Sequence, residues 1–337
     1  MGLFSKLLNA LGRPQTPASV PEVSAAPRTI RNVHLRKDWL TLSQPQFFGQ
    51  AYRSPNQHWV VGCSDSDGNG TGGFRQSGNG RVVLVDPDAD QVLHELTCFA
   101  RPTKAAVADT GRYVIHDCGF GSALQGDVVA VDTDGRERYR RHYSANIFNI
   151  GLSRCGRFAA IQTANAPSDD GNVLEVLDLE HGRIVFSVAP ESGWADQYSF
   201  EVDAAGNLKS IGVDHRGLGR FHYSATGEFQ DAQALQAARL DKGDYSTKLM
   251  AARDLLRTDA TADAARKALS TADAALAQGA QDRPDWTAVA HRVRGEAYDL
   301  LGQLPEALAA YELALSQNPK IGVQRRASAL RKKLGGT

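Results

Sequence analysis

The sequence predicts a protein with two folded parts of different class, an all-β repeat region followed by an all-α region. Three observations support this prediction. A strand motif recurs at a fixed interval, the periodicity changes from strand to helix after Phe229, and a length of 337 residues suggests two domains. The expected boundaries are residues 1–27 for an N-terminal helix and linker, 28–230 for the β region, and 231–337 for the helical region.

The recurring motif is an apolar strand that ends in a short polar residue. Its copies are residues 82–86, 128–132, 173–178 and, more weakly, 220–224. The residues that end them, Asp86, Asp132, Asp178 and Ser224, follow one another at intervals of 46 residues. A fixed period of this length is typical of a repeat architecture.

Each repeat is expected to contain four short strands separated by turns rich in Asp and Gly, residues that tolerate the backbone of tight turns. Four evenly spaced strands per unit favour a β-propeller-like domain of four to five blades, with the ring left incomplete as an alternative. Residues 29–43 are expected to close the ring or to start a fifth blade. Helices from the C-terminal region could instead cover the exposed sheet edges.

These repeats resemble the broad β-propeller superfamily of WD-repeat-like and quinoprotein-like blades over about 200 residues. The chain departs from the WD-repeat pattern, because no repeat ends in Trp-Asp and none begins with Gly-His. No tryptophan recurs in register, so the resemblance implies no quinone cofactor, and no cofactor of any kind is expected.

The composition narrows the functional class. A formal net charge of zero disfavours a nucleic-acid-binding protein, and the sequence has no apolar run long enough to span a membrane. The four cysteines, Cys63, Cys98, Cys118 and Cys155, have no metal-binding or disulfide-framework spacing. We therefore expect reduced thiols and a cytoplasmic location.

The first eleven residues form one amphipathic helical face made of Leu3, Phe4, Leu7, Leu8 and Leu11. A proline-rich linker follows, and a helix this short is unstable alone in water. The segment is interpreted as a docking helix for a partner or for the chain itself, with a membrane anchor or a frayed terminus as alternatives. Stable membrane insertion is not expected.

Two clusters in the β region contain residue types that carry chemistry. The first, Asp65, Asp67 and Asn69, is a weak candidate for a calcium loop, although it lacks the later glutamate that such loops use. The second is His116-Asp117-Cys118, in which His116 and Cys118 share one face of a strand while Asp117 faces away. Plain turn residues and strand residues are the competing interpretations.

The C-terminal region is expected to contain helices near residues 232–240, 245–257, 261–278, 286–301, 306–317 and 323–334, separated by Pro284, Pro305 and Pro319. Residues 288–321 resemble a tetratricopeptide repeat (TPR) on the small residues Gly295, Ala307 and Ala314, the aromatics Tyr298 and Tyr311, and Pro319. The hairpin before it resembles a degenerate TPR.

The TPR resemblance implies a partner-binding concave face on the first helix of each hairpin. The residues expected to line it are Val289, Arg292, Glu296, Asp299, Leu300, Val323 and Arg326. Some TPR proteins bind a peptide carboxylate with an Asn at the position of Glu296, so that class of partner is disfavoured. The basic last helix either caps the stack or binds an acidic partner.

The sequence therefore predicts a non-enzymatic scaffold that docks unidentified protein partners on its propeller-like and TPR-like surfaces, with self-association as a further possibility. The alternative is a metal-dependent hydrolase with its site in the propeller loops, near Asp65, Asp67, His116 and His215.

Overall fold

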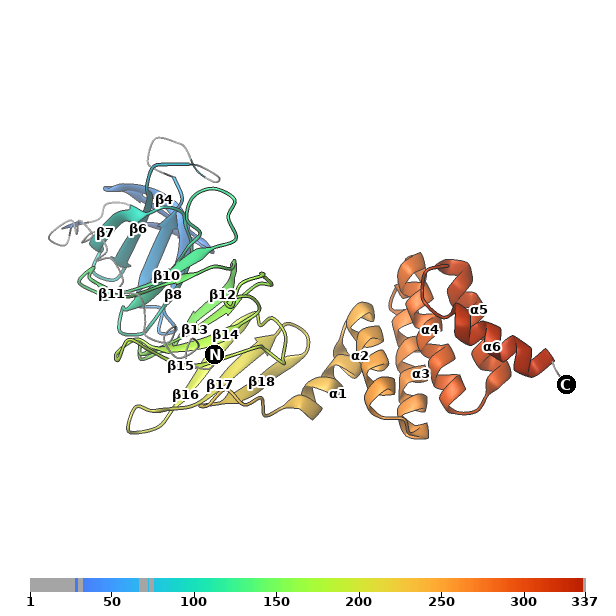
Figure 1. Cartoon of the computed structure of the whole chain (residues 1–337). Helices are drawn as coiled ribbons and strands as arrows, with labels where there is room; N and C mark the ends of the chain where they lie inside the picture. Colours follow the sequence, from blue (N-terminus) through green and yellow to red (C-terminus); the bar gives the residue numbers. More distant parts are fainter. Residues whose placement is uncertain (1–27, 30–32, 67–71, 73–75, 336–337) are drawn as a thin grey trace, which may run out of the picture. The chain divides into compact units, whose positions relative to one another are not determined.

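The computed structural model describes residues 28–29, 33–66, 72 and 76–335 (Figure 1). The chain divides into two compact units, and the division runs through the third β-sheet. The first unit contains the first two sheets and strand β12, and the second unit contains the fourth sheet and the helices. Two predictions fall on residues outside the described part of the chain. They are the amphipathic N-terminal face, with Leu3, Phe4, Leu7 and Leu8, and the calcium-loop candidates Asp67 and Asn69.

The β region consists of antiparallel strands in four sheets (Figure 1). The first sheet contains β1 (Arg28–Thr29), β2 (His34–Arg36), β3 (Trp39–Ser43), β4 (Gln46–Arg53), β5 (Val60–Ser64), β6 (Gly80–Asp86) and β7 (Gln91–Phe99). The second contains β8 (Pro102–Val107), β9 (Tyr113–Asp117), β10 (Gly126–Val131) and β11 (Glu137–Tyr143). The third contains β12 (Ile147–Leu152), β13 (Phe158–Thr163), β14 (Leu174–Asp178) and β15 (Arg183–Val188), and the fourth contains β16 (Gln197–Val202), β17 (Leu208–His215) and β18 (Gly219–Ser224).

The predicted fold class is confirmed: propeller-like β-sheets precede a region of helices. The repeated motif forms β6, β10, β14 and β18, the third strand of each repeat. The fourth sheet has only three strands, because the chain after Ser224 pairs back through a single bridge between Tyr223 and Phe229 before the first helix begins.

Residues 29–43 extend the first sheet and form no fifth blade. Strand β3 pairs with β4, β2 pairs with β3, and β1 pairs with β7 at the other end of the strand order. In a flat sheet, six strand spacings would separate β1 from β2 by about 29 Å. Thr29 and His34 are five residues apart and therefore span at most about 19 Å. The first sheet must therefore curl until its two ends approach each other.

The curl explains why β6 reads Val-Val-Leu-Val without polar alternation. Val83 and Val85 pack with Leu40, Leu42 and Phe47 in one core cluster. Val82 and Leu84, which point to the opposite face, pack in a second cluster that also contains residues of β8, β9 and β10. A strand that is buried on both faces needs apolar residues at every position.

The turn between the first two strands of each repeat has the same backbone geometry. A positive φ occurs at Gln57 (63°), Gly111 (86°) and Gly156 (76°), and Gly206 (81°) takes the same place in the fourth repeat. In every copy, the amide of this residue donates a hydrogen bond to the carbonyl three residues earlier. Glycine is favoured here because it adopts the left-handed region without steric cost, and Gln57 is the exception.

The helical region contains α1 (Ala232–Lys242), α2 (Tyr245–Thr258), α3 (Ala262–Ala277), α4 (Pro284–Leu300), α5 (Leu304–Gln317) and α6 (Gln324–Gly335), with a short 3₁₀ helix at Ala280–Asp282. Pro284 and Pro305 lie in the first turn of α4 and α5 and not between helices. The first turn tolerates proline because its N–H groups have no intrahelical partner. None of the helices in the described part of the chain could cross a membrane.

The α4–α5 hairpin is packed closely around Gly295. A Cβ atom at Gly295 would lie 2.5 Å from the Cδ1 and Cε1 atoms of Tyr311, whose side chain is fully buried. Ala307 and Ala314 of α5 are also buried, and Tyr298 packs against the same core cluster. Small residues at these positions allow the two helices to approach each other.

Candidate functional site

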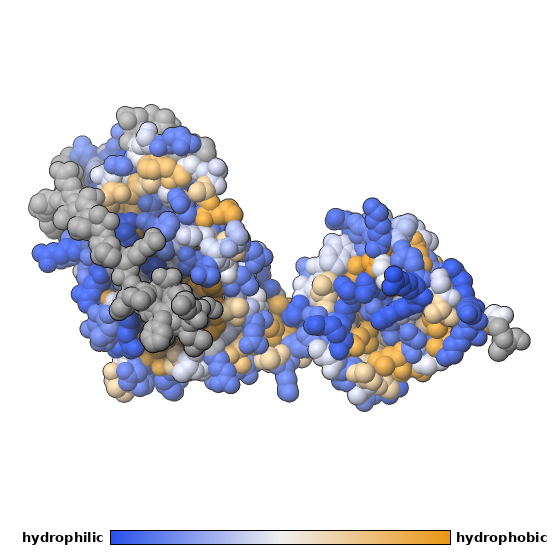
Figure 2. Space-filling model, in the orientation of Figure 1, coloured by the Kyte–Doolittle hydropathy of each residue, from blue (hydrophilic) through white to orange (hydrophobic). Residues whose placement is uncertain are grey.

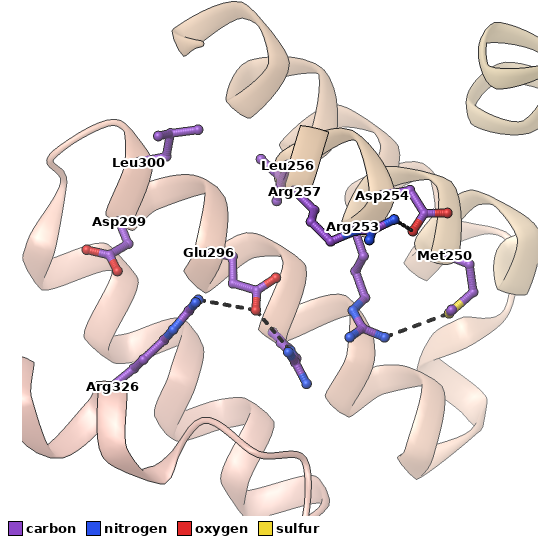
Figure 3. A pocket seen from close by; sticks show the side chains of 10 residues that line it. Met250, Arg253, Asp254, Leu256, Arg257, Glu296, Asp299, Leu300 and Arg326 are labelled. Atoms are coloured by element: carbon purple, nitrogen blue, oxygen red, sulfur yellow. Dashed lines mark hydrogen bonds and ion pairs between the residues drawn. The ribbon is translucent and has the colours of Figure 1, made fainter. Parts of the chain in front are cut away.

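A groove of about 660 Å³ opens on the helical region (Figure 3). Its walls come from α2, α4 and α6. Met250, Arg253, Asp254 and Arg257 lie on one face of α2, because they are spaced three and four residues apart. The lining residues of α4, with the same helical spacing, are Arg292, Glu296, Asp299 and Leu300, and α6 contributes Arg326.

Glu296 lies between the other lining residues of the groove and binds two arginines (Figure 3). Its Oε1 atom accepts hydrogen bonds from Arg292 Nε at 3.0 Å and from Arg326 Nη1 at 3.3 Å. Arg292 Nη1 also donates to the carbonyl of Ile321 at 2.9 Å. The Glu296 side chain is only 14% exposed, so this carboxylate is held in place and its charge is compensated by two guanidinium groups.

Apolar and charged side chains line the parts of the groove on either side of Glu296 (Figure 3). Met250 and Leu300 are 39% and 38% exposed. Asp254 pairs with Arg257 at 3.6 Å and with Arg239 at 3.9 Å. Arg253 lies 3.9 Å from the Met250 sulfur, and no carboxylate of the described residues lies within ion-pair distance of it. With four arginines and three acids, the groove has a surplus of one positive charge.

Five of the seven residues predicted to line a binding face do line this groove: Arg292, Glu296, Asp299, Leu300 and Arg326. The other two pack into the protein, since Val323 is buried and Val289 packs against the core of the helical region. The contribution of α2 to the groove was not predicted from the sequence. The helical spacing of Met250, Arg253 and Arg257 indicates that these residues share one face of α2, in the hairpin that resembles a degenerate TPR.

The face of the groove mixes polar and apolar groups. Figure 2 shows hydrophobic and hydrophilic side chains interspersed over the visible surface of the helical region.

In the part of the β region that the structure describes, one group of side chains could hold a metal ion: His58, Asp86 and Asp88. It does not include Asp65, His116 or His215. His58 Nδ1 lies 3.3 Å from Asp88 Oδ2, and His58 Nε2 lies 3.7 Å from Asp86 Oδ2. Asp86 also accepts hydrogen bonds from the amides of Asp88 and Ala89, which closes the turn after β6.

The other repeats explain why His58 stands beside Asp86. In the second repeat, Arg112 Nε bonds to Asp132 Oδ1 at 2.6 Å, and in the third, Arg157 Nη2 bonds to Asp178 Oδ2 at 2.9 Å. His58 occupies the position of these arginines. The periodic aspartate thus ties the start of the second strand to the end of the third. The His58 cluster is explained by this structural role.

Asp178 shows how strong this contact is. Burial alone would raise the pKa of its carboxyl group, but hydrogen bonds from Arg157 and His181 outweigh burial and hold the pKa well below its usual range. The recurring acid that defines the repeat in the sequence is therefore a structural residue.

A second surface lies on the first sheet. Trp39 and Phe48 stack with ring centroids 5.0 Å apart, and they are 44% and 61% exposed. They line a groove of about 460 Å³ with His34, Arg36 and Thr41. Its neighbour, a groove of about 1060 Å³, shares Trp39, Thr41 and Phe48, and Asp65 of the predicted calcium loop lines it.

No protein-family model matches the chain, and no curated protein matches its sequence. Among solved structures it is similar to BamB from Moraxella catarrhalis, with 13% identity over 53% of this chain and 46% of that chain and a TM-score of 0.33. It is also similar to the C-terminal WD40 domain of Sif2, with 12% identity over 52% of this chain and 45% of that chain and a TM-score of 0.34.

A third similar structure is the β-propeller domain of Cps50 (Swd1) from Myceliophteria thermophila, with 10% identity, coverage of 56% of this chain and 54% of that chain, and a TM-score of 0.35. The chain spans about half the length of each of these three structures. At these identities the similarity concerns the fold alone.

Proposed function

We propose that the protein is a non-enzymatic interaction scaffold, and that the groove between α2, α4 and α6 holds a peptide segment of a protein partner. The observation that carries this proposal is the groove itself. It is lined by one face from each of three helices, and it combines exposed apolar side chains with fixed charges. A concave surface of this kind presents a broad and rigid contact area.

We further propose that α4 and α5 form a TPR hairpin and that α2 and α3 form a degenerate one. The contact of Gly295 with the Tyr311 ring supports this proposal, as do the buried Ala307 and Ala314. In this interpretation α2, α4 and α6 are the helices that line the concave face, and α3 and α5 lie behind them. Each helix packs against the next along the chain, and α2 also contacts α4.

The charges of the groove indicate the chemistry of the partner. From the sequence, Glu296 was expected to disfavour partners that bind through a peptide carboxylate, and its pairing with Arg292 and Arg326 weakens that expectation. Of the four arginines that line the groove, Arg253 is the one with no carboxylate of the described residues within ion-pair distance. A peptide with separate apolar side chains against Met250 and against Leu300, and with an acidic group near Arg253, would fit both features.

The test uses Arg253→Glu, because this change removes the unpaired cation without leaving a buried carboxylate unpaired. Wild-type and variant full-length proteins would be used as bait in native extract at two salt concentrations, with bound proteins measured by quantitative mass spectrometry. We expect at least one partner whose capture falls about tenfold or more with Arg253→Glu. The same capture would fall as the salt concentration rises.

Lys332→Glu is the matched control, because it makes the same charge reversal on an exposed position of α6 that does not line the groove. Partners lost with Arg253→Glu and kept with Lys332→Glu support the proposal. If both variants capture the same proteins as the wild type in the same amounts, the groove is not a partner-binding surface.

A further inference from the structure

Three side chains of the second sheet converge at a point that the scaffold function does not use. Cys118 Sγ lies 3.4 Å from His116 Nε2 and 3.2 Å from Thr103 Oγ1, and Thr103 Oγ1 lies 3.4 Å from His116 Nδ1. These contacts are all the polar partners of the His116 ring among the described residues. His116 is buried, whereas Cys118 is partly exposed.

The backbone sets this arrangement. His116 and Cys118 are two residues apart and point to the same side of the chain. Thr103 is an extra residue in β8, because Pro102 pairs with Asp117 and Lys104 pairs with His116. Such a bulge redirects a side chain, and here it brings the threonine hydroxyl to the histidine and the cysteine.

Neighbouring contacts hold the three residues in place. The Asp117 carboxylate accepts hydrogen bonds from the amides of Ala100, Arg101 and Gly119, which fixes the chain on both sides of the cluster. Tyr52 donates to the carbonyl of Thr103 at 2.8 Å. A Cβ atom at Gly126 would lie 3.1 Å from His116 Nε2, so glycine on the adjacent strand leaves room for the ring.

The internal repeats show that the fold does not require a histidine at this position. Counted from the preceding turn, Gly62, Ile161 and Ile211 take this place in the other three repeats. Counted by strand pairing, Cys63 and Asp214 take it in the first and fourth repeats, so no other repeat has a histidine there by either count. The second repeat instead buries an imidazole and places a thiol and a hydroxyl against it.

The three contacts form a triangle of polar atoms at the His116 ring. The Cys118 thiol, 3.4 Å from Nε2, is the group that can give a proton to the ring, and the threonine hydroxyl, 3.2 Å from Sγ, can donate to the sulfur. Burial foremost, and then Lys104 and Arg101, lower the pKa of His116 to about 4, so the ring is neutral at pH 7. The same shift makes the ring a weaker base, so it takes the thiol proton only as the sulfur bonds to carbon. After proton transfer, the sulfur would accept from both Nε2–H and the threonine hydroxyl.

We propose that Cys118 and His116 form a nucleophile–base pair that makes Cys118 a site of covalent modification by α,β-unsaturated carbonyl compounds. The thiol proton moves to His116 Nε2 while Sγ forms a bond to the β-carbon. The electron pair of the carbon–carbon double bond moves to the carbonyl to give an enolate. The enolate then takes the proton from Nε2, which restores the neutral ring and leaves a thioether.

The experiment measures the rate at which each cysteine of the full-length protein reacts with N-ethylmaleimide, by peptide mass spectrometry between pH 6 and pH 8. Cys155 is the reference, because it is exposed and its polar contact is with Ser153 and not with an imidazole. If exposure alone set the rates, Cys155 would react faster than Cys118. We expect Cys118 to react about tenfold or more faster than Cys155. We also expect the Cys118 rate to depend less on pH, because His116 is neutral throughout this range.

Two variants separate a chemical role from a structural one. His116→Gln is expected to lower the Cys118 rate about tenfold and to leave Cys155 unchanged. Thr103→Val keeps the side-chain shape and is expected to lower the Cys118 rate several-fold, because it removes one donor to the sulfur. Cys63 is buried and reports on folding, since it stays unlabelled while the β region is intact.

The proposal is overturned if Cys118 reacts no faster than Cys155 in the wild type. It is also overturned if His116→Gln leaves the ratio of the two rates unchanged while Cys63 stays protected. If His116→Gln makes Cys63 reactive, the fold has changed and Thr103→Val is the deciding variant. An unchanged ratio of the Cys118 rate to the Cys155 rate in Thr103→Val overturns the proposal, and a lowered ratio supports it.

Discussion

Replacing Gly295 with alanine tests whether the close approach of α4 and α5 shapes the helical region. The added Cβ would lie 2.5 Å from two atoms of the buried Tyr311 ring and 3.1 Å from a third. Carbon atoms prefer separations of about 3.5–4.0 Å, so the overlap is about 1 Å. Overpacking of this kind costs about 1–3 kcal/mol, and we take the upper end because Tyr311 has no space to move into.

Alanine in a helix is favoured over glycine by about 1 kcal/mol, which offsets part of this cost. We therefore expect Gly295→Ala to destabilise the α4–α5 hairpin by about 2 kcal/mol. Amide hydrogen exchange in the full-length protein, read by mass spectrometry on peptides from α4 and α5, would speed up about 30-fold. Gly335→Ala is the control, because its Cβ would meet no atom within 4 Å.

A double-mutant cycle identifies the cause. In a Tyr311→Leu background the ring is gone, and Gly295→Ala should then be neutral or stabilising. If Gly295→Ala slows exchange in the wild-type background, or costs the same in both backgrounds, the contact with Tyr311 does not determine the hairpin geometry.

Two further predictions concern the β region. Gly156→Ala should lower the free energy of unfolding by about 1–2 kcal/mol, because alanine is strained at a φ of 76°, and thermal unfolding measures this loss. Gly193→Ala is the control for the backbone contribution, because Gly193 has a φ of 78° and its added Cβ would meet no atom within 4 Å. Burial lowers the pKa of His94 to about 4, although its bond to Thr133 and the Asp134 charge act in the opposite direction. The contribution of the neutral His94 ring to the free energy of unfolding is fully present above pH 6.5. As the pH decreases towards 4, the free energy of unfolding falls by up to about 1.4 kcal/mol per pH unit, because the unfolded chain takes up a proton that the folded ring does not. Denaturant titrations of His94→Gln should therefore show a weaker dependence of this free energy on pH. An unchanged slope would contradict the assignment.

Much of the element order could be predicted because local patterns determine it. The recurring apolar strand motif and the Asp- and Gly-containing turns gave strand positions within a few residues. The helical periodicity after Phe229 did the same for α2 to α6. Gly295 and Tyr311 were singled out by the resemblance to a tetratricopeptide repeat, and the structure places them in direct contact. Whether the groove beside them binds a partner stays a prediction.

The pairing of residues 29–43 was missed, because strand alternation identifies a strand but not its neighbour. Leu40 and Leu42 predict one buried face whichever sheet receives them. One signal was available: only Gln44 and Pro45 separate β3 from β4, and so short a connection joins strands that pair with each other. The α2 wall of the groove was missed for a similar reason, since no local pattern tells which helix faces α4.

Comparison of the repeats within the chain separates structural residues from residues that need another explanation. His58 replaces an arginine that binds the periodic aspartate, yet it still contacts that aspartate, so the architecture explains it. No other repeat has a histidine at the position of His116, and its ring contacts only Thr103 and Cys118 among polar groups of the described residues. A buried imidazole is costly unless its hydrogen bonds are made. The second repeat makes these bonds to a thiol that solvent can reach, which is why the reactivity of Cys118 is the more informative measurement on the β region.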